Sequence, residues 1–352
     1  MNLSCTNTAG TRWVAHRPGY IYGQARDRHQ PEVAKMRDFA CRTILCAAGL
    51  YVTAAFTGYG LASANDATYL YVLGVAQDGG YPQAGCYQPH CLRGWKDPAH
   101  RRTASAVAVV DGTSSRKYLF DATPDIGAQL YRLHRTAPDG AFQLAGVFLT
   151  HAHIGHYTGL MQFGHEVMGA RDVPVYAMPR MHAFLSENGP WDQLVRYDNI
   201  ELKPLADNEE VVLSTSVRVT PFLVPHRDEY SETVGFRIDG PNRSAVYLPD
   251  IDKWERWDTD IRDIVRSVDY ALVDATFFAD GELSGRDMSN IPHPFVTESM
   301  ALFDELAPDE KARVIFIHMN HTNPLLFEDS EEQDAVREKG FRVAFEGMRL
   351  KL

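Results

Sequence analysis

Three histidines lie within six residues, directly after an apolar stretch of this chain. His151, His153 and His156 follow the apolar run over residues 145–149. Imidazole nitrogens are among the commonest protein ligands of zinc and other transition metals. Residues two apart on an extended segment project to the same side, and Gly155 allows the chain to turn sharply before His156. The spacing therefore predicts a metal site rather than a cluster of buried structural histidines.

The segment resembles the His-x-His-x-Asp-His signature of the metallo-β-lactamase superfamily, with Gly155 at the position of the signature aspartate. In that superfamily one metal is held by the first two motif histidines, a distant histidine and a bridging aspartate. The second is held by the signature aspartate, the last motif histidine, the bridging aspartate and a final histidine. The resemblance assigns the first metal to His151, His153, His226 and Asp250, and the second metal to His156, Asp250 and His318.

The second ligand group is one carboxylate short, because Gly155 has no side chain. A catalytic zinc site can keep only three protein ligands. We therefore expect one firmly bound zinc and one weaker zinc, with iron or manganese as alternative metals. His293, flanked by Pro292 and Pro294, could contact substrate, donate a proton, replace the missing ligand or lie in solvent. Asp252 could also replace that ligand or face solvent.

Asp121 ends another apolar run, one predicted strand before the histidine cluster. Its position resembles that of an early aspartate of the superfamily. The resemblance implies a role in the catalytic site, in which Asp121 orients a ligand histidine and does not bind metal itself. An aspartate that stabilises a turn or caps a helix is the alternative.

More of the chain carries a closer resemblance. Most of residues 69–352 is similar to the family of pyrroloquinoline-quinone biosynthesis B proteins. The segments that carry this similarity are residues 72–74, 79–83, 121–130, 149–160, 233–235 and 318–324. The fuller histidine complement resembles the superfamily branch that processes phosphoribosyl cyclic phosphate.

A second metal site is expected in the loop that contains Cys86 and Cys91. In the phosphodiesterase branch, three cysteines at this place and a histidine after the last catalytic histidine hold a structural zinc. Cys86, Cys91 and His321 match that pattern, whereas Gln88 stands at the middle cysteine, which leaves His90 as the nearest fourth ligand. A disulfide between the two cysteines and a pair of free thiols are the alternatives.

The N-terminal residues resemble a secretory signal peptide. Arg37 and Arg42 precede an uncharged run over residues 43–62, which ends at the small residues 62–64. We expect a disordered extension or misassigned start over residues 1–35, a signal peptide over 36–64 and a catalytic domain over 65–352. A periplasmic or secreted protein follows from this pattern. An amphipathic N-terminal helix is the alternative.

The charge of the chain excludes some partners. Residues 1–64 hold seven Lys and Arg but only three Asp and Glu, so their removal takes the formal charge from −11 to −15. Nucleic acids and anionic membranes bind clustered positive charge, so neither is an expected partner. No run in residues 65–352 is long enough to cross a bilayer. We expect a small-molecule substrate, which can be highly anionic only if the metal centre attracts it locally.

Strand-like and helix-like segments alternate along the chain, which indicates an α/β domain. Strands are predicted at residues 69–75, 104–110, 117–120, 146–149, 174–177, 217–224, 234–238, 245–248, 270–273, 314–317 and 342–345. Helices are predicted at 126–134, 159–168, 180–188, 261–268, 296–306 and 329–339. The superfamily resemblance implies a four-layer αββα sandwich.

These observations predict a metal-dependent hydrolase of the metallo-β-lactamase superfamily. A metal-bound hydroxide would attack an ester, amide or phosphodiester, without a serine or cysteine nucleophile. An iron-dependent hydroxylase related to quinone-cofactor biosynthesis is the alternative enzyme, because histidines with a carboxylate also suit non-haem iron. A quinone-binding protein without turnover is the third hypothesis.

Overall fold

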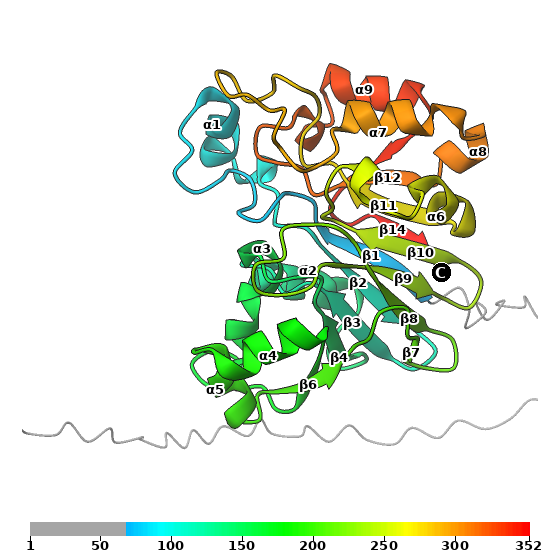
Figure 1. Cartoon of the computed structure of the whole chain (residues 1–352). Helices are drawn as coiled ribbons and strands as arrows, with labels where there is room; N and C mark the ends of the chain where they lie inside the picture. Colours follow the sequence, from blue (N-terminus) through cyan, green and yellow to red (C-terminus); the bar gives the residue numbers. More distant parts are fainter. Residues whose placement is uncertain (1–67) are drawn as a thin grey trace, which may run out of the picture. The chain divides into compact units, whose positions relative to one another are not determined.

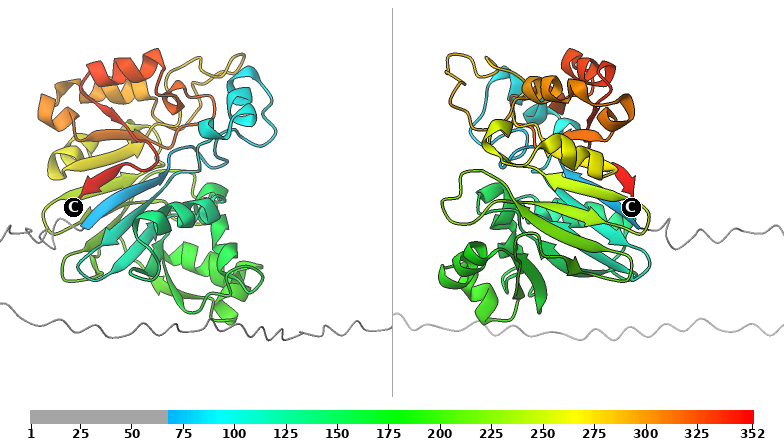
Figure 2. Two further views of the ribbon diagram at one scale, coloured as in Figure 1. Left: turned by 180° about the vertical axis from the view of Figure 1, so that it is seen from behind. Right: turned by 45° about the vertical axis from the view of Figure 1, so that its right-hand side comes forward.

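The computed structural model describes residues 68–352, which form two seven-stranded sheets with helices on both outer faces (Figures 1 and 2). This arrangement confirms the α/β sandwich expected from the sequence. The extension expected over residues 1–35 and the signal peptide expected over 36–64 lie outside the described residues. Between residues 68 and 352, no helix is both long and apolar enough to span a membrane.

The first sheet is antiparallel from β14 to β3 and parallel from β3 to β6. Strands β14, β1, β2 and β3 pair antiparallel, and β3, β4, β5 and β6 pair parallel. The strands in spatial order are β14 (Arg349–Lys351), β1 (Thr68–Gly74), β2 (Ala106–Asp111), β3 (Arg116–Phe120), β4 (Gln143–Phe148), β5 (Val173–Ala177) and β6 (Ile200–Pro204).

The second sheet has the same mixed character. Strands β13, β12, β11 and β10 pair parallel, and β10, β9, β8 and β7 pair antiparallel. In spatial order they are β13 (Arg342–Val343), β12 (Val314–Ile317), β11 (Tyr270–Asp274), β10 (Ser244–Leu248), β9 (Val234–Asp239), β8 (Arg218–Leu223) and β7 (Val211–Val212).

Helices cover the face of each sheet that points away from the other sheet (Figures 1 and 2). The helices beside the first sheet are α2 (Ile126–Thr136), α3 (Ile154–Tyr157), α4 (Pro179–Glu187) and α5 (Trp191–Arg196). Those beside the second are α6 (Ile261–Ser267), α7 (Val296–Leu302), α8 (Pro308–Lys311) and α9 (Glu331–Glu338). A further helix, α1 (Pro89–Lys96), follows the loop after β1.

Aromatic rings fill the space between the sheets. Phe120 and Phe148 of the first sheet stack with centroids 5.0 Å apart, and Phe236 of the second contacts both edgewise at 5.4 and 5.6 Å. Central strands such as β2 and β10 are buried at every position. Because each sheet is covered on both faces, its central strands are mostly apolar and do not alternate with polar residues.

The helix predicted over residues 159–168 is wrong. The structure has the short helix α3 and then a 3-10 helix, Thr158–Phe163. Gly159 packs so closely on the preceding aspartate loop that a Cβ atom there would lie 2.1 Å from the carbonyl oxygen of Thr123. Close backbone approach to this loop therefore determines the local conformation, and helical periodicity does not.

Candidate metal centre

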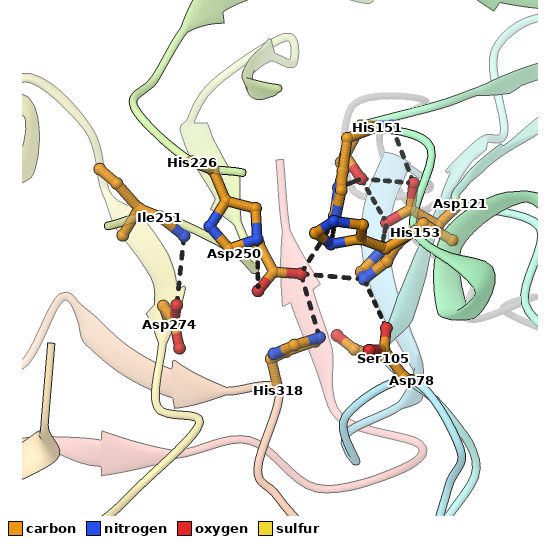
Figure 3. Close-up of polar contacts among 12 residues, drawn as sticks. Asp78, Ser105, Asp121, His151, His153, His226, Asp250, Ile251, Asp274 and His318 are labelled. Carbon is orange, nitrogen blue, oxygen red and sulfur yellow. Dashed lines mark hydrogen bonds and ion pairs between the residues drawn. The ribbon is translucent and has the colours of Figure 1, made fainter. Parts of the chain in front are cut away.

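The proposed ligands all follow the carboxyl ends of strands, at one end of the two sheets (Figure 3). Those after β1 and β4 in the first sheet are Asp78, His151, His153 and His156, and those after β8, β10 and β12 in the second are His226, Asp250 and His318. Because these strand ends meet at one edge of the sandwich, the loops that follow them surround a common space.

Asp250 lies at the middle of this space (Figure 3) and is 3% exposed. Its Oδ2 atom lies 2.9 Å from Nε2 of His156 and 3.3 Å from Nε2 of His318. The same oxygen lies 3.5 Å from Nε2 of His151, and Oδ1 lies 3.7 Å from Nε2 of His226. The aspartate thus touches both ligand groups that the sequence defines.

The ligand atoms fall into two groups on either side of Asp250. Those of His151, His153 and His226 lie within 4.8 Å of one another, as do those of Asp78, His156 and His318. The structure therefore brings together every residue of the two predicted ligand groups and adds Asp78 to the second.

Thr150 fixes the tautomer of His151. Oγ1 of Thr150 lies 2.9 Å from the Asp121 carboxylate and 3.0 Å from Nδ1 of His151. Because the hydroxyl donates its proton to the carboxylate, its oxygen accepts from Nδ1–H. Nε2 of His151 then keeps its lone pair and faces the centre, as metal-binding histidines do.

Carboxylates hold two further histidines from behind. Nδ1 of His156 lies 2.7 Å from Asp121, which is buried and also accepts from the backbone N–H of Thr150. Nδ1 of His226 lies 3.3 Å from Asp252. Asp252 is therefore neither a ligand nor a solvent-facing carboxylate, the two roles expected from the sequence, but supports His226.

His153 is turned the other way round. Its Nδ1 atom lies 2.8 Å from Nε2 of His151, whereas its Nε2 atom lies 3.2 Å from Glu229 on the outside. Nδ1 is therefore the nitrogen of His153 that can bind a metal in this centre.

The electrostatics of the centre favour a bound cation. Burial and His156 lower the pKa of His151 well below its ordinary value, and burial also lowers the pKa of His318. Burial opposes the charge on Asp250, but the surrounding histidines, His318 foremost, hold the pKa of Asp250 well below its usual range. Burial opposes the charge on His156, but Asp121, Asp250 and Asp78 outweigh it and raise the pKa of His156 well above its ordinary value. An ionised carboxylate beside the neutral imidazoles of His151 and His318 is the kind of donor set that zinc takes in catalytic sites.

Unpartnered polar atoms also fit a metal. Nε2 of His156, Nε2 of His226 and Nε2 of His318 are buried and have no hydrogen-bond partner among the described residues. Oδ1 of Asp78 is in the same condition. Because buried polar groups without partners are rare and costly in folded proteins, these atoms fit the ligand shell of a divalent cation.

His293 lies beside the first ligand group, not at position 155. Its ring centroid is 5.2 Å from that of His226, and its Nδ1 atom lies 2.7 Å from Asp274. Burial opposes protonation, but Asp274 and Asp250 outweigh it and raise the pKa of His293 to about 9. An imidazolium at neutral pH can donate a proton. The ligand atoms of His226, Asp250 and His293 also lie within 4.8 Å of one another, so His293 can bind a metal of the first group when it is deprotonated.

Asp78 stands next to Gly155 and is the residue that sequence reasoning missed. Its Oδ1 atom lies 3.3 Å from Nε2 of His156. Asp78 follows β1 and precedes Gly79 and Gly80, a carboxylate on a glycine-rich turn after a strand. That pattern is a signal in the sequence, although it does not indicate which histidine the carboxylate reaches.

A cavity of about 740 Å³ opens beside the centre. Asp78 and His293 contribute to its wall, as do two exposed arginines, Arg227 and Arg286. Phe277, together with Ile291 and other residues, adds an apolar side. The metal centre is therefore accessible to a small molecule with both charged and apolar parts.

A second cluster lies at one side of this cavity. The ligand atoms of Cys86, His90, Cys91 and His321 lie within 4.8 Å of one another, and Sγ of Cys86 is 3.3 Å from Nε2 of His90. The two cysteines are free thiols. Burial raises the pKa of Cys91 to about 12, so its thiolate needs a cation nearby. Two thiols and two imidazoles fit a tetrahedral structural zinc.

Comparison with known proteins places this geometry in a family. Residues 116–319 match the model of the β-lactamase superfamily domain. The chain is 29% identical to coenzyme PQQ synthesis protein B of Methylobacterium sp. (strain 4-46), over 80% of this chain and 99% of the relative. It is 28% identical to the protein of the same name from Xanthomonas campestris pv. campestris (strain B100), over 80% and 99%.

Solved structures give the same picture. The zinc-bound PqqB from Methylobacterium extorquens matches with a TM-score of 0.68 and 26% identity, covering 81% of this chain and all of that one. A diphosphatase of the PhnP family matches with a TM-score of 0.57 and 24% identity, covering 80% and 96%. The second likeness concerns the fold alone.

Proposed function

The chain belongs to the β-lactamase superfamily, and we propose that it is a metal-dependent hydrolase of an anionic ester, with zinc as its metal. One observation carries this proposal. A buried carboxylate, Asp250, lies beside a cavity that is open to small molecules. Around it, the Nε2 atoms of His156, His226 and His318 are buried and have no hydrogen-bond partner within residues 68–352. The zinc-bound relative supports the choice of metal.

Two groups of residues would hold metal. His151, His153, His226 and Asp250 form the first group, and His156, His318 and Asp250 belong to the second. When bound, a divalent metal supplies Lewis acidity that lowers the pKa of a coordinated water toward about 7. The protein contributes the orientation of the rings, through Thr150, Asp121 and Asp252.

His293 is proposed as the proton donor to the leaving group. It contributes to the cavity wall, and Asp274 and Asp250 keep it protonated at neutral pH. A general acid must be protonated at the working pH and able to reach the leaving atom. His293 meets the first condition and lies on the cavity wall, within reach of a bound molecule.

Arg227 and Arg286 support a substrate with a phosphate or carboxylate group. Both are exposed on the cavity wall, and the nearest carboxylate to Arg227 is Glu229, 3.9 Å away. The whole chain carries a formal charge of −11, so long-range attraction would not bring an anion to the site. Two guanidinium groups at the cavity supply that attraction locally.

The test is a substrate screen with zinc-loaded and manganese-loaded protein on phosphodiesters, lactones and β-lactams. We expect turnover of a phosphodiester or another anionic ester, lost when the metal is chelated and restored when zinc returns. Arg227→Ala should raise KM for such a substrate more than it changes kcat. Absence of metal-dependent turnover of all three classes would refute hydrolysis.

A second candidate function rests on the relatives named coenzyme PQQ synthesis protein B, which the chain matches over nearly their whole length. In this alternative the centre holds iron and oxidises a quinone precursor, or binds a quinone-like molecule without turnover. Iron retained through purification, with oxygen consumption on addition of substrate, would favour the oxidase. Zinc or manganese with ester hydrolysis would favour the hydrolase.

Export to a periplasm or beyond is proposed for the same protein. The support is the sequence pattern alone, Arg37 and Arg42 before the uncharged run over residues 43–62.

A further inference from the structure

We propose that Asp78 is the carboxylate ligand of the second metal, in place of the aspartate that the histidine motif lacks at position 155. The carboxylate comes from the loop after β1 and not from the histidine motif. With Asp78 included, the centre has enough ligands for two divalent cations. The inference rests on the proposed metal-dependent function and specifies how its second site is built.

The first argument is steric. A Cβ atom at Gly155 would lie 2.4 Å from the Cα atom of Asp78 and 2.3 Å from its Oδ1 atom. Contacts this short with backbone atoms cannot be relieved by rotating a side chain. The loop after β1 can therefore place the Asp78 carboxylate here only because residue 155 is glycine. The two positions occupy the same space, and only one of them can carry the ligand.

The second argument is that the backbone holds Asp78 beside His318. The N–H of Gln77 donates to the carbonyl of Met319 at 2.8 Å, and the N–H of Met319 donates to Val75 at 2.8 Å. A turn bond from Gly80 to Gln77, also 2.8 Å, closes the loop around Asp78. These bonds hold the loop that carries Asp78 against Met319, the residue after the ligand His318.

The third argument is charge. His156 has three carboxylates around it: Asp121 at 2.7 Å from Nδ1, and Asp250 at 2.9 Å and Asp78 at 3.3 Å from Nε2. Even a protonated imidazole neutralises only one of them. Buried negative charge without compensation is expensive, so the arrangement requires more positive charge than His156 can supply. A divalent cation between these groups supplies it.

The fourth argument is that the atoms facing this space are unsatisfied. Oδ1 of Asp78, Nε2 of His156 and Nε2 of His318 are buried, lack hydrogen-bond partners among the described residues and lie within 4.8 Å of one another. Oδ1 of Asp78 lies 3.3 Å from Nε2 of His156, but the two atoms make no hydrogen bond. Atoms that bind one cation lie close together without hydrogen bonds between them, and Asp250 would be the fourth donor.

The direct test is Asp78→Asn, which keeps the shape and removes the charge. Zinc per chain is measured after dialysis, and zinc affinities are measured by competition with a chelating dye. We expect the variant to hold one zinc fewer than the wild type, with the weaker affinity lowered by at least about tenfold. Asp287→Asn is the matched control, because Asp287 lies on the loop after Gly281 and bonds to Ser289 without touching a ligand histidine. It should keep the wild-type stoichiometry.

Exchange of the two positions tests the relocation itself. Gly155→Asp alone should lower Tm and leave metal content unchanged or reduced, because the new side chain collides with Asp78. In Asp78→Gly/Gly155→Asp the Cβ atom of residue 155 still meets the Cα atom of residue 78, so the double variant should not recover the zinc lost in Asp78→Gly. Recovery of that zinc would contradict the steric argument.

Two results would overturn the inference: wild-type zinc content and affinities in Asp78→Asn, or an anomalous zinc peak beside His156 and His318 in crystals of the wild type that lies beyond bonding distance of Asp78. The crystallographic measurement decides the question even if a variant fails to fold. Both outcomes are independent of turnover. A wild type that binds two zinc ions through Asp78 but hydrolyses nothing would refute the proposed function and leave this inference intact.

Discussion

Oγ1 of Thr276 lies 3.1 Å from Nδ1 of His318, and the same hydroxyl lies 2.7 Å from the carboxylate of Asp274. This chain of contacts repeats, in the second sheet, the chain from Asp121 through Thr150 to His151 in the first. In both, a carboxylate takes the threonine proton, and the threonine oxygen takes the histidine proton. In each half of the sandwich, a threonine therefore orients one of the histidines with its Nε2 lone pair toward the centre.

Thr276→Val should lower the affinity of the second metal by roughly 10–100-fold, because Nδ1 of His318 loses its acceptor and the ring is no longer held in one tautomer. Zinc titration measures the effect. Thr276→Ser should retain the wild-type affinity, since serine keeps the hydroxyl. Equal affinities in all three proteins would show that the contact does not orient the ligand.

His151→Ala and His226→Ala should each remove the tighter metal and lower kcat by roughly a thousandfold or more, since several kcal/mol of activation free energy depend on it. Zinc content and turnover are measured together. His134→Ala, an exposed residue of α2, is the control and should change neither. Retained metal and turnover in His151→Ala would exclude the assignment of the first site.

Glu282 should make stability fall as pH rises. Burial raises its pKa from 4.5 to about 7, although Thr322 and the N–H of Phe278 donate to it. The folded state therefore binds the proton more tightly than the unfolded state, and unfolding free energy decreases between these two pKa values.

Glu282→Gln removes this dependence. Between about pH 5 and about pH 8 the wild type should lose on the order of 2 kcal/mol of unfolding free energy relative to the variant. Chemical denaturation at both pH values measures it, and Glu187→Gln, an exposed residue at the end of α4, is the control. Parallel profiles for wild type and Glu282→Gln would contradict the prediction.

Cys91→Ser should remove one zinc per chain and lower Tm, because Cys91 is buried in the second cluster. His90→Ala should weaken the same zinc if His90 is the fourth ligand, whereas His100→Ala, outside the cluster, should not. An intact-mass measurement without reductant distinguishes the alternatives, since a disulfide makes the wild type lighter by two hydrogens. Unchanged zinc content in Cys91→Ser would eliminate the structural site.

The exported protein should begin near Asn65, after the small residues at positions 62–64. Intact-mass measurement of secreted protein identifies its first residue. Ala64→Asp should block cleavage, because the enzyme that removes signal peptides requires a small residue there. Secreted protein that retains residues 36–64 would disprove the cleavage site.

The sequence predicts the centre well where the signal is local. His151, His153 and His156 lie on one turn, so their spacing alone indicates a metal site. His226, Asp250 and His318 are far apart in sequence, and only the superfamily resemblance identifies them. The two-sheet architecture also depends on that resemblance, since alternation of strands and helices indicates α/β and no more.

Asp78 and Asp252 show where such reasoning ends. A carboxylate can bind the metal directly or hold a ligand histidine from behind. The two roles differ by about the length of one side chain in the folded protein, and the spacing of residues along the sequence does not predict that difference. In the sequence, Gly155 indicates a missing ligand. In the structure, Asp78 occupies the space that a side chain at position 155 would need.

The division of ligands between the sheets has a consequence for folding. One sheet supplies His151, His153 and Asp78, and the other supplies His226, Asp250 and His318. A cation at this centre is therefore a cross-link between two halves that otherwise meet through aromatic packing, and its binding free energy adds to the cohesion of the whole domain. Removal of metal should raise the rate of backbone hydrogen exchange at the strand ends of both sheets. Return of metal should lower that rate in both sheets together.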